Sequence, residues 1–207
     1  VRGSMTSRPV DEVVTEVRSL VKQGFQEVVV TGIHLSSYGV DCKDARAFVG
    51  AEGKPLLELL SMIGEVDGIH RIRLGSLEPR IITEGFLREL ANHEKVCPHF
   101  HLSLQSGCDA TLARMNRHYT ISEYADKCEL IRGVYQNPAI TTDVIVGFPG
   151  ETEEEFECTK KNLEEMRLAE MHIFKYSRRD GTKAASTPEQ VPEEIKTKRS
   201  NELLKLD

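Results

Sequence analysis

The sequence predicts an α/β fold in which parallel strands form a sheet and helices lie outside it. The main observation is a unit of one amphipathic helix and one apolar strand, which recurs five times along the 207 residues. Most connections are short, and polar or glycine residues follow the strands. Alternating strands and helices of this kind are typical of parallel sheets. Two architectures fit, an open doubly wound sheet and part of a (β/α) barrel, and both place functional residues at the carboxyl ends of the strands.

The first unit consists of a helix that begins at Pro9 and a strand over 27–31. Proline suits the first turn of a helix, and Gly24 is the expected end. The apolar positions of this helix form one stripe, as a packed helix requires: Val13, Val14, Val17, Leu20 and Val21. Residues 35–55 are polar and contain glycine, so that we expect a long loop there.

Capping residues mark the start of three later helices. Thr83 precedes a helix that extends to Glu94, and two other threonines each precede a glutamate by three residues, which is the pattern of a capping box. These boxes are Thr120 with Glu123 and Thr152 with Glu155. The remaining predicted elements are helices over 56–66 and after 109, and strands over 71–77, 99–104, 140–146 and 170–176.

Composition excludes several classes of protein. The formal net charge of −6 does not favour strong nucleic-acid binding by bulk electrostatics. No apolar run reaches the length of a membrane span and no signal peptide is visible, so we expect a cytoplasmic protein with no membrane partner. The odd number of cysteines indicates reduced thiols, and their spacing fits no zinc or iron–sulfur motif. They are Cys42, Cys97, Cys108, Cys128 and Cys158.

A Gly-Phe-Pro-Gly turn over 147–150 follows the strand over 140–146, at the expected functional edge of the sheet. The glycines permit close approach of the backbone to a ligand, and the proline stiffens the turn. Glu151, Glu153 and Glu154 follow, and acidic residues suit the positive end of a helix. Other polar or small residues are expected at the same edge, in a ring around a pocket: Thr31, Gly32, Ser76, Glu78, Gln105, Ser106, Gly107, Asp143, Tyr176, Ser177 and Arg178.

Six segments carry a resemblance to a known enzyme family, and they follow one another in the order of that family. They are "SRPVDEVVTEV", "VVVTGIHLSSYG", "SLEP", "HLSLQSGCDATLARMNRHYT", "TTDVIVGFPGETEEEF" and "KYSRRDGTKAA". These segments resemble the radical S-adenosylmethionine (SAM) methylthiotransferases, which attach a methylthio group to a tRNA base or a ribosomal protein. "TGIHLSSYG", "VCPHFHLSLQSG" and "SRRDGTKAA" are most similar to the branch that acts on N6-threonylcarbamoyladenosine beside the tRNA anticodon.

The resemblance implies a partial (β/α) radical SAM barrel whose first strand is missing from this chain. It also implies SAM and two 4Fe–4S clusters as cofactors of the parent enzyme, a reductant protein, and the tRNA anticodon loop as partner. One cluster binds SAM, and an N-terminal domain holds the other. A C-terminal TRAM domain helps to hold the tRNA.

The chain departs from the family pattern because the cluster motif CxxxCxxC is missing. In the family this motif precedes an "RG…SRP" segment, which Arg2-Gly3 and Ser7-Arg8-Pro9 match here. We therefore interpret residues 1–190 as a radical SAM core fragment, inactive alone, and residues 191–207 as a helical linker toward the TRAM domain. The linker has a thin apolar seam at Ile195, Leu203 and Leu206. Residues 1–4 are either native sequence or the remnant of a tag.

By motif position, the resemblance also assigns residues to SAM. Gly32 lets the backbone approach the methionine amino group, and Glu78 accepts from an amine or hydroxyl of the ligand. Gln105, Ser106 and Gly107 face the ribose or the methionine. For Glu78 the alternative is a capping role beside the proline that follows it.

Further assignments concern the carboxylate and adenosine of SAM. Arg117 is the candidate for the methionine carboxylate, because a guanidinium binds carboxylates in a bidentate manner. Asp143 and the turn that starts at Gly147 are expected near the adenosyl group, and Phe148 or Tyr176 beside the adenine. The alternatives are a solvated arginine and buried aromatic core residues. A basic cluster is a candidate for the anticodon loop, with a solvated charge run as alternative: Arg178, Arg179 and Lys183.

Three other functions remain as alternatives. The first is a methylthiotransferase that acts on isopentenyladenosine tRNA or on a ribosomal protein. The second is a barrel metal-dependent hydrolase, since histidines on or beside strands bind zinc in such enzymes; the candidates are His34, His99, His101 and His172. The third is a non-catalytic module that binds RNA or a protein partner.

Overall fold

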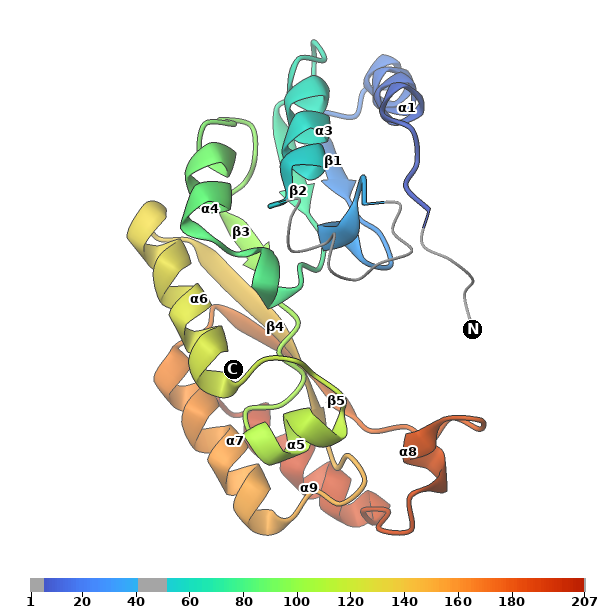
Figure 1. Cartoon of the computed structure of the whole chain (residues 1–207), viewed down its shortest axis with the longest axis vertical. Coiled ribbons are helices and arrows are strands. Elements are labelled where there is room, and N and C mark those ends of the chain that lie inside the picture. The colour runs from blue at the N-terminus through green and yellow to red at the C-terminus, as the bar shows by residue number, and fades with distance from the viewer. Residues whose placement is uncertain (1–5, 41–51, 207) are drawn as a thin grey trace. The chain divides into compact units, whose positions relative to one another are not determined.

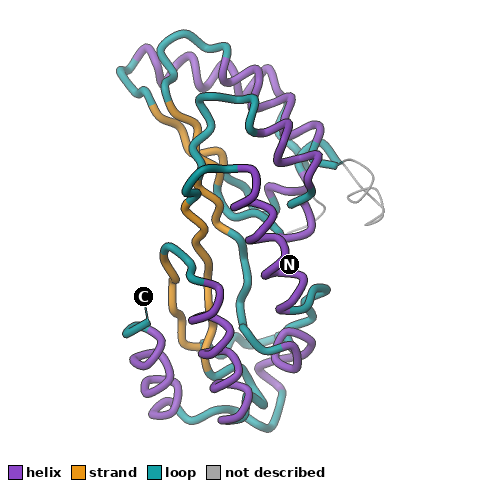
Figure 2. The backbone as a smooth tube through the Cα atoms, turned by 90° about the vertical axis from the view of Figure 1, so that its left-hand side faces the viewer, coloured by secondary structure: helices purple, strands orange, loops and turns teal. Residues whose placement is uncertain are grey.

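The computed structural model describes residues 6–40 and 52–206, and the chain divides into two compact units (Figure 1). Unit 1 consists of Val1–His101 and Glu129–Pro138, and unit 2 of Leu102–Cys128 and Ala139–Asp207. Both units combine helices with short strands, as Figure 2 shows in purple and orange. In the described residues no helix is both long enough and apolar enough to cross a membrane.

Unit 1 is built on two parallel strands. Its elements in chain order are α1 (Val10–Lys22), β1 (Glu27–Val30), the 3-10 helix η1 (Leu35–Ser37), α3 (Lys54–Gly64), β2 (Arg71–Leu74), the 3-10 helix η2 (Pro79–Ile81), α4 (Glu84–Leu90) and β3 (His99–His101). The pairing of β1 with β2 runs from Glu27 opposite Arg71 to Val30 opposite Leu74. The core comes from the predicted faces: Val14 and Val17 of α1 are buried, and so are Leu56, Leu57, Leu59, Leu60 and Ile63 of α3.

Unit 2 contains the longest strand of the described chain. Its elements are α5 (Asp109–Arg114), the start of α6 (Ile121–Val134), β4 (Ala139–Val146), α7 (Glu153–Met166), β5 (Glu170–Lys175), α8 (Lys183–Ser186) and α9 (Glu193–Leu203). Strands β4 and β5 are parallel, from Thr141 opposite Glu170 to Val146 opposite Lys175. Residues 102–105 lie beside β4. The Leu102 amide donates to the Thr141 carbonyl and the Gln105 amide to the Asp143 carbonyl, each at 2.9 Å.

The predicted α/β class with parallel strands is confirmed, and so are the three caps. The Thr83 hydroxyl accepts from the Phe86 amide at 3.1 Å. Both capping boxes form, and the Thr152 hydroxyl accepts from the Glu155 amide at 3.2 Å while the Glu155 carboxylate accepts from the Thr152 amide at 3.2 Å. These helix starts depend on contacts three residues apart, which the sequence alone encodes.

Two strands are three residues shorter than predicted, for identifiable reasons. Strand β2 ends at Leu74 instead of residue 77, because the Glu78 amide donates to the Ser36 hydroxyl and Pro79 then starts η2. Strand β3 ends at His101 instead of residue 104. After His101 a side chain replaces part of the backbone hydrogen bonding between strands. The Thr142 hydroxyl accepts from the Leu104 amide at 3.0 Å and donates to the Leu102 carbonyl at 2.5 Å.

The predicted loop over 35–55 contains more structure than expected. It includes η1, and α3 already begins at Lys54 after Gly53, whose φ of 71° favours glycine. Residues 41–51, with Cys42, lie outside the described residues. The short helices η2 and α8 were not predicted.

Candidate functional site

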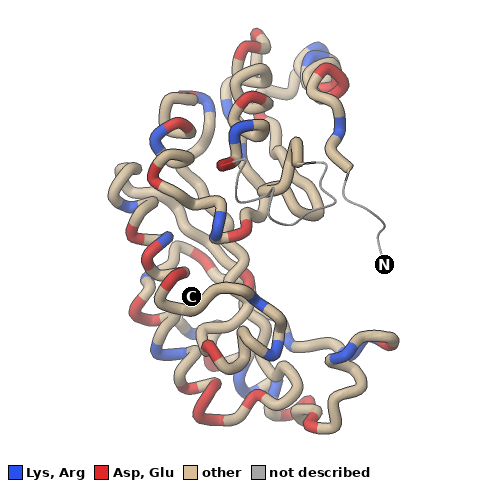
Figure 3. The backbone as a smooth tube through the Cα atoms, in the orientation of Figure 1, with Lys and Arg blue, Asp and Glu red and all other residues tan. Residues whose placement is uncertain are grey.

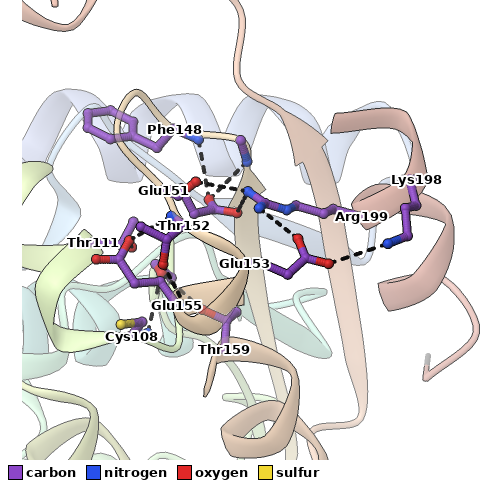
Figure 4. A network of polar contacts seen from close by, with 12 residues as sticks. Cys108, Thr111, Phe148, Glu151, Thr152, Glu153, Glu155, Thr159, Lys198 and Arg199 are labelled. Carbon is purple, nitrogen blue, oxygen red and sulfur yellow. Dashed lines mark hydrogen bonds and ion pairs between the residues drawn. The ribbon is translucent and has the colours of Figure 1, made fainter. Parts of the chain in front are cut away.

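The turn between β4 and α7 is held by the carboxylate of Glu151 (Figure 4). Its Oε2 accepts from the amides of Gly147 at 2.9 Å and Phe148 at 3.3 Å. Sequence analysis assigned Glu151 to the positive end of the following helix, and this assignment is wrong. The Glu151 carboxylate points toward the turn because two amides of the turn donate to one of its oxygens. The acidic side chains at the start of α7 are those of Glu153 and Glu154.

Arg199 of α9 forms a buried ion pair with Glu151. Its Nη1 lies 2.8 Å from Glu151 Oε1 and 3.2 Å from the Glu151 carbonyl oxygen, and its Nη2 lies 2.9 Å from Glu153 Oε2. The side chains of Arg199 and Glu151 are only 4% and 5% exposed. Burial raises the pKa of Glu151 above its ordinary value, although Arg199 acts in the opposite direction. A buried pair of this kind is costly to break, because the remaining partner is left as a lone buried charge.

Lys196, one turn earlier in α9, packs on the same turn. Gly147 has a φ of 71°, and a Cβ at this position would collide with the Lys196 side chain. The Lys196 Nζ donates to the Tyr176 carbonyl at 3.1 Å and lies 5.4 Å from the centre of the Tyr176 ring. Glycine at 147 is therefore required both by the backbone angle and by the packing of α9.

Phe148 and Tyr176 form an aromatic pair where β4 and β5 end. Their ring centres are 5.4 Å apart in an edge-to-face arrangement, and the Tyr176 amide donates to the Val146 carbonyl at 2.9 Å. The Tyr176 hydroxyl is buried and has no hydrogen-bond partner among the described residues. Buried polar groups are nearly always paired, so this hydroxyl is a candidate for contact with a ligand.

The loop over 105–107 packs against α7. The Ser106 hydroxyl lies 3.3 Å from the Thr159 hydroxyl and accepts from the Cys108 amide at 3.3 Å. A Cβ at Gly107 would lie 2.9 Å from the Thr159 carbonyl oxygen. Packing alone thus explains the small residues at 106 and 107, and their assignment to SAM stays a prediction.

Three residues of unit 2 complete the predicted set. Gln105 has a φ of 75°, which is unusual for a residue other than glycine. Asp143 lies within β4 and not after it, and its Oδ1 is 3.3 Å from His172 Nδ1 on β5. Arg117 is half-buried in the turn after α5, and in the described part of the chain its guanidinium has no ion-pair partner. These placements leave their proposed SAM contacts as predictions.

The two predicted residues of unit 1 lie after its strands. The Glu78 side chain is 14% exposed; its Oε1 accepts from Arg80 Nε at 2.5 Å, whereas its buried Oε2 has no partner in the described ranges. Gly32 borders a cavity of about 690 Å³ that α1, β1 and the loop after β1 line. The nearest atoms to a Cβ at Gly32 would be 3.9 Å away, so that packing does not require glycine there.

The cysteines of the described chain do not fit an iron–sulfur cluster. Cys97, Cys108, Cys128 and Cys158 form no disulfide, and no three of them approach closely enough to hold one metal centre in the described residues. Cys128 is fully buried in α6.

Sequence analysis missed several residues that shape the site. Two tyrosines bind the strand-end carbonyls of unit 2: the Tyr119 hydroxyl donates to Ser103 at 2.6 Å and the Tyr124 hydroxyl to Leu102 at 3.1 Å. Lys196 and Arg199 were assigned to a charged linker. Their spacing with Leu203 is that of one helix face, which is the signal that was available.

The predicted apolar seam of this last helix is correct at Leu203, which is fully buried. It is wrong at Ile195, which is 38% exposed. The buried face of α9 passes through Lys196 and Arg199 instead, because both cations find buried partners on the loops after β4 and β5.

Comparison with known proteins gives one family over most of the chain. The family model described as "Radical SAM superfamily" matches residues 1–163. The chain is 40% identical over its whole length to a tRNA-2-methylthio-N(6)-dimethylallyladenosine synthase of Carboxydothermus hydrogenoformans, and covers 45% of that protein. It is also 40% identical, over 99% of its length, to the threonylcarbamoyladenosine tRNA methylthiotransferase MtaB of Bacillus subtilis, of which it covers 44%. The chain thus spans less than half the length of these relatives.

Solved structures support the same fold. Coproporphyrinogen III oxidase (HemN) from Escherichia coli matches 95% of this chain and 45% of its own, with a TM-score of 0.64 and 14% identity. The archaeal Elp3 of Methanocaldococcus infernus matches 96% of this chain and 51% of its own, with a TM-score of 0.61 and 14% identity. At these identities the likeness concerns the fold alone.

Proposed function

Because the chain belongs to the radical SAM superfamily, we propose that it is the central part of a tRNA methylthiotransferase. The observation that carries this proposal is the 40% identity over the whole chain to two proteins named as enzymes of this kind. The family uses SAM and iron–sulfur clusters, and the cluster ligands would come from parts of the longer protein outside these 207 residues.

For the substrate, we propose N6-threonylcarbamoyladenosine beside the anticodon, with the methylthio group added at C2. The segments "TGIHLSSYG" and "SRRDGTKAA" support this choice. Dimethylallyladenosine is the second candidate, since relatives named for that base are equally similar, at 40% identity. Neither of these relatives is named as a metal-dependent hydrolase.

The residues that fit SAM best are those with polar atoms left without a partner. Glu78 offers a buried carboxylate oxygen to an amine or hydroxyl, and Tyr176 offers a buried hydroxyl. The Phe148–Tyr176 pair offers aromatic surface to the adenine. When bound, SAM supplies the adenosyl group. In unit 2 the Tyr176 hydroxyl would orient it, and in unit 1 the Glu78 oxygen is a separate candidate for a SAM contact.

For tRNA, we propose contacts to phosphates from the loop after β5, whose basic residues are blue in Figure 3. Arg178, Arg179 and Lys183 are exposed and form no ion pair with any described residue. The loop is ordered by its own bonds, since the Thr182 hydroxyl donates to the Arg179 carbonyl at 2.8 Å. Neutralising phosphates releases counterions, so binding would weaken with salt.

The test uses the longer protein, with the expected N-terminal cluster domain, the cysteine loop and the TRAM domain, beside the 207-residue chain. Both are reconstituted with iron and sulfide without oxygen and incubated with SAM, reductant and tRNA. We expect only the longer protein to bind iron, cleave SAM and add a methylthio group to threonylcarbamoyladenosine, detected by mass spectrometry of the tRNA nucleosides. A longer protein that binds no cluster would overturn the proposal, and modification of dimethylallyladenosine alone would replace the substrate.

A triple variant tests the RNA contact. Replacing Arg178, Arg179 and Lys183 by Gln should weaken tRNA binding by the longer protein and reduce the slope of its salt dependence by about three. The matched control replaces three exposed cations that already have partners, Arg71, Arg88 and Lys161. Equal effects of the two triple variants would contradict a specific role of the loop.

A further inference from the structure

We propose that Lys196 and Arg199 of α9 are positioning residues, which hold the loops after β4 and β5 in the geometry that SAM binding requires. The inference rests on the proposed function for the identity of the ligand. It makes α9 a part of the cofactor site, whether or not the helix also connects to a further domain.

The segment over 189–199 contacts the turn over 147–150 at three successive points. The Gly150 amide donates to the Glu189 carbonyl at 2.8 Å. The Lys196 side chain packs against Gly147, and Arg199 binds the carboxylate that accepts the Gly147 and Phe148 amides. A displacement of the segment over 189–199 therefore moves the start, the middle and the end of the turn together.

Helix α9 also holds the loop after β5. Lys196 Nζ donates to the carbonyl of Tyr176, and Lys175 at the end of β5 lies 2.6 Å from Glu193 Oε1 and 3.3 Å from the Thr197 hydroxyl. Phe148 on one loop and Tyr176 on the other are the aromatic pair of the candidate site. One helix thus sets the distance between the two rings.

Burial of the two cations has an energetic cost. Both cations are buried, Lys196 at 8% exposure and Arg199 at 3%. Apolar residues at such positions often stabilise a protein as well or better, so a buried ion pair is weak evidence for a role in stability alone. It does impose a specific geometry, because Glu151 satisfies both turn amides only while its other oxygen is held by Arg199. The turn amides are consequently closed to a ligand, and the turn offers the Phe148 ring instead.

The test begins with amide hydrogen exchange on the 207-residue chain without ligand. In Arg199→Gln we expect the Gly147 and Phe148 amides to exchange about tenfold faster through local opening, which depends little on added urea. Exchange of β4 amides such as that of Val144 should follow the global loss of stability and depend strongly on urea. Lys198→Gln is the matched control, since Lys198 lies beside Arg199 and pairs with the same Glu153, but is exposed. Exchange of the two turn amides that depends on urea as strongly as that of Val144, or an equal effect of Lys198→Gln, would overturn local positioning.

SAM affinity of the longer protein provides the second measurement. We expect Arg199→Gln to weaken SAM binding about tenfold with turnover at saturating SAM nearly unchanged, and Arg199→Lys to recover part of the loss. Lys196→Met keeps the packing on Gly147 but removes the bond to Tyr176, and serves if Arg199→Gln does not fold. Unchanged affinity in both variants would overturn the inference. A wild-type protein that binds no SAM would instead contradict the proposed function, and amide exchange would still decide whether α9 holds the turn.

Discussion

Glu78 and Glu151 are both glutamates that follow a parallel strand and lie within two residues of a proline, yet their carboxylates have different partners in the structure. In unit 1, one Glu78 oxygen binds Arg80 and the other is buried without a partner among the described residues. In unit 2, both Glu151 oxygens are engaged by the chain itself, one by two amides and one by Arg199. The Glu78 carboxylate therefore has one oxygen available to accept a hydrogen bond from a ligand. Both oxygens of the Glu151 carboxylate already bind groups of the chain and fix the conformation of the loop after β4.

The largest expected effect comes from breaking the Glu151–Arg199 pair. Arg199→Gln leaves the Glu151 carboxylate buried with no cation, and should lower the free energy of unfolding by about 3–5 kcal/mol. Urea denaturation of the 207-residue chain measures this. Lys198→Gln should stay within about 0.5 kcal/mol of wild type. A loss below about 1 kcal/mol for Arg199→Gln would show that the pair is not buried as described.

Replacing one glycine in each unit by alanine compares the loops that follow the strands of the two units. Gly147→Ala should lower the free energy of unfolding by about 2 kcal/mol, because alanine meets both a positive φ and the Lys196 side chain. Gly32→Ala has neither problem and should cost less than about 1 kcal/mol. Equal losses in thermal unfolding would contradict this contrast. If Gly32→Ala still abolishes SAM binding by the longer protein, glycine at 32 is needed by the ligand.

Glu78→Gln tests the free oxygen directly. The amide keeps the shape of the carboxylate, so stability should change by less than about 1 kcal/mol. The affinity of the longer protein for SAM should fall about tenfold, since a hydrogen bond to a charged group is lost. Isothermal titration measures this, with Glu84→Gln as an exposed control on the following helix. An unchanged affinity would assign Glu78 to the turn before η2 alone.

The smallest effect is a pH dependence that belongs to Glu151. Burial raises the pKa of its carboxyl above the unfolded value of 4.5, so the native state holds this proton more tightly. The resulting stability is fully present below the unfolded pKa and is lost as the pH rises through the native pKa. Glu153, Glu155 and Glu193 act in the opposite sense, because cationic partners lower their pKa values.

The difference between wild type and Glu151→Gln isolates this component. We expect wild-type stability, relative to the variant, to fall as the pH rises above 4.5. Urea unfolding at several pH values provides the curve. A difference that rises with pH would mean that Arg199 dominates over burial.

Sequence by itself determined the local part of this protein. The helix stripes, the threonine caps and the apolar strands depend on residues two to four positions apart, and these spacings predicted the α/β class and nearly every long helix. The motifs also placed Phe148 and Tyr176 at strand ends, where the structure pairs them.

Tertiary structure alone decided how the strand-end residues are used. Arg199 is 48 residues from Glu151, and Lys196 is 20 residues from Tyr176, so no local period links either pair. Burial of α9 on unit 2 removes both cations from water and makes these carboxylate and carbonyl partners necessary. The same folding leaves one oxygen of Glu78 without a partner. Which glutamate serves the fold and which is left for a ligand depends on these long-range contacts.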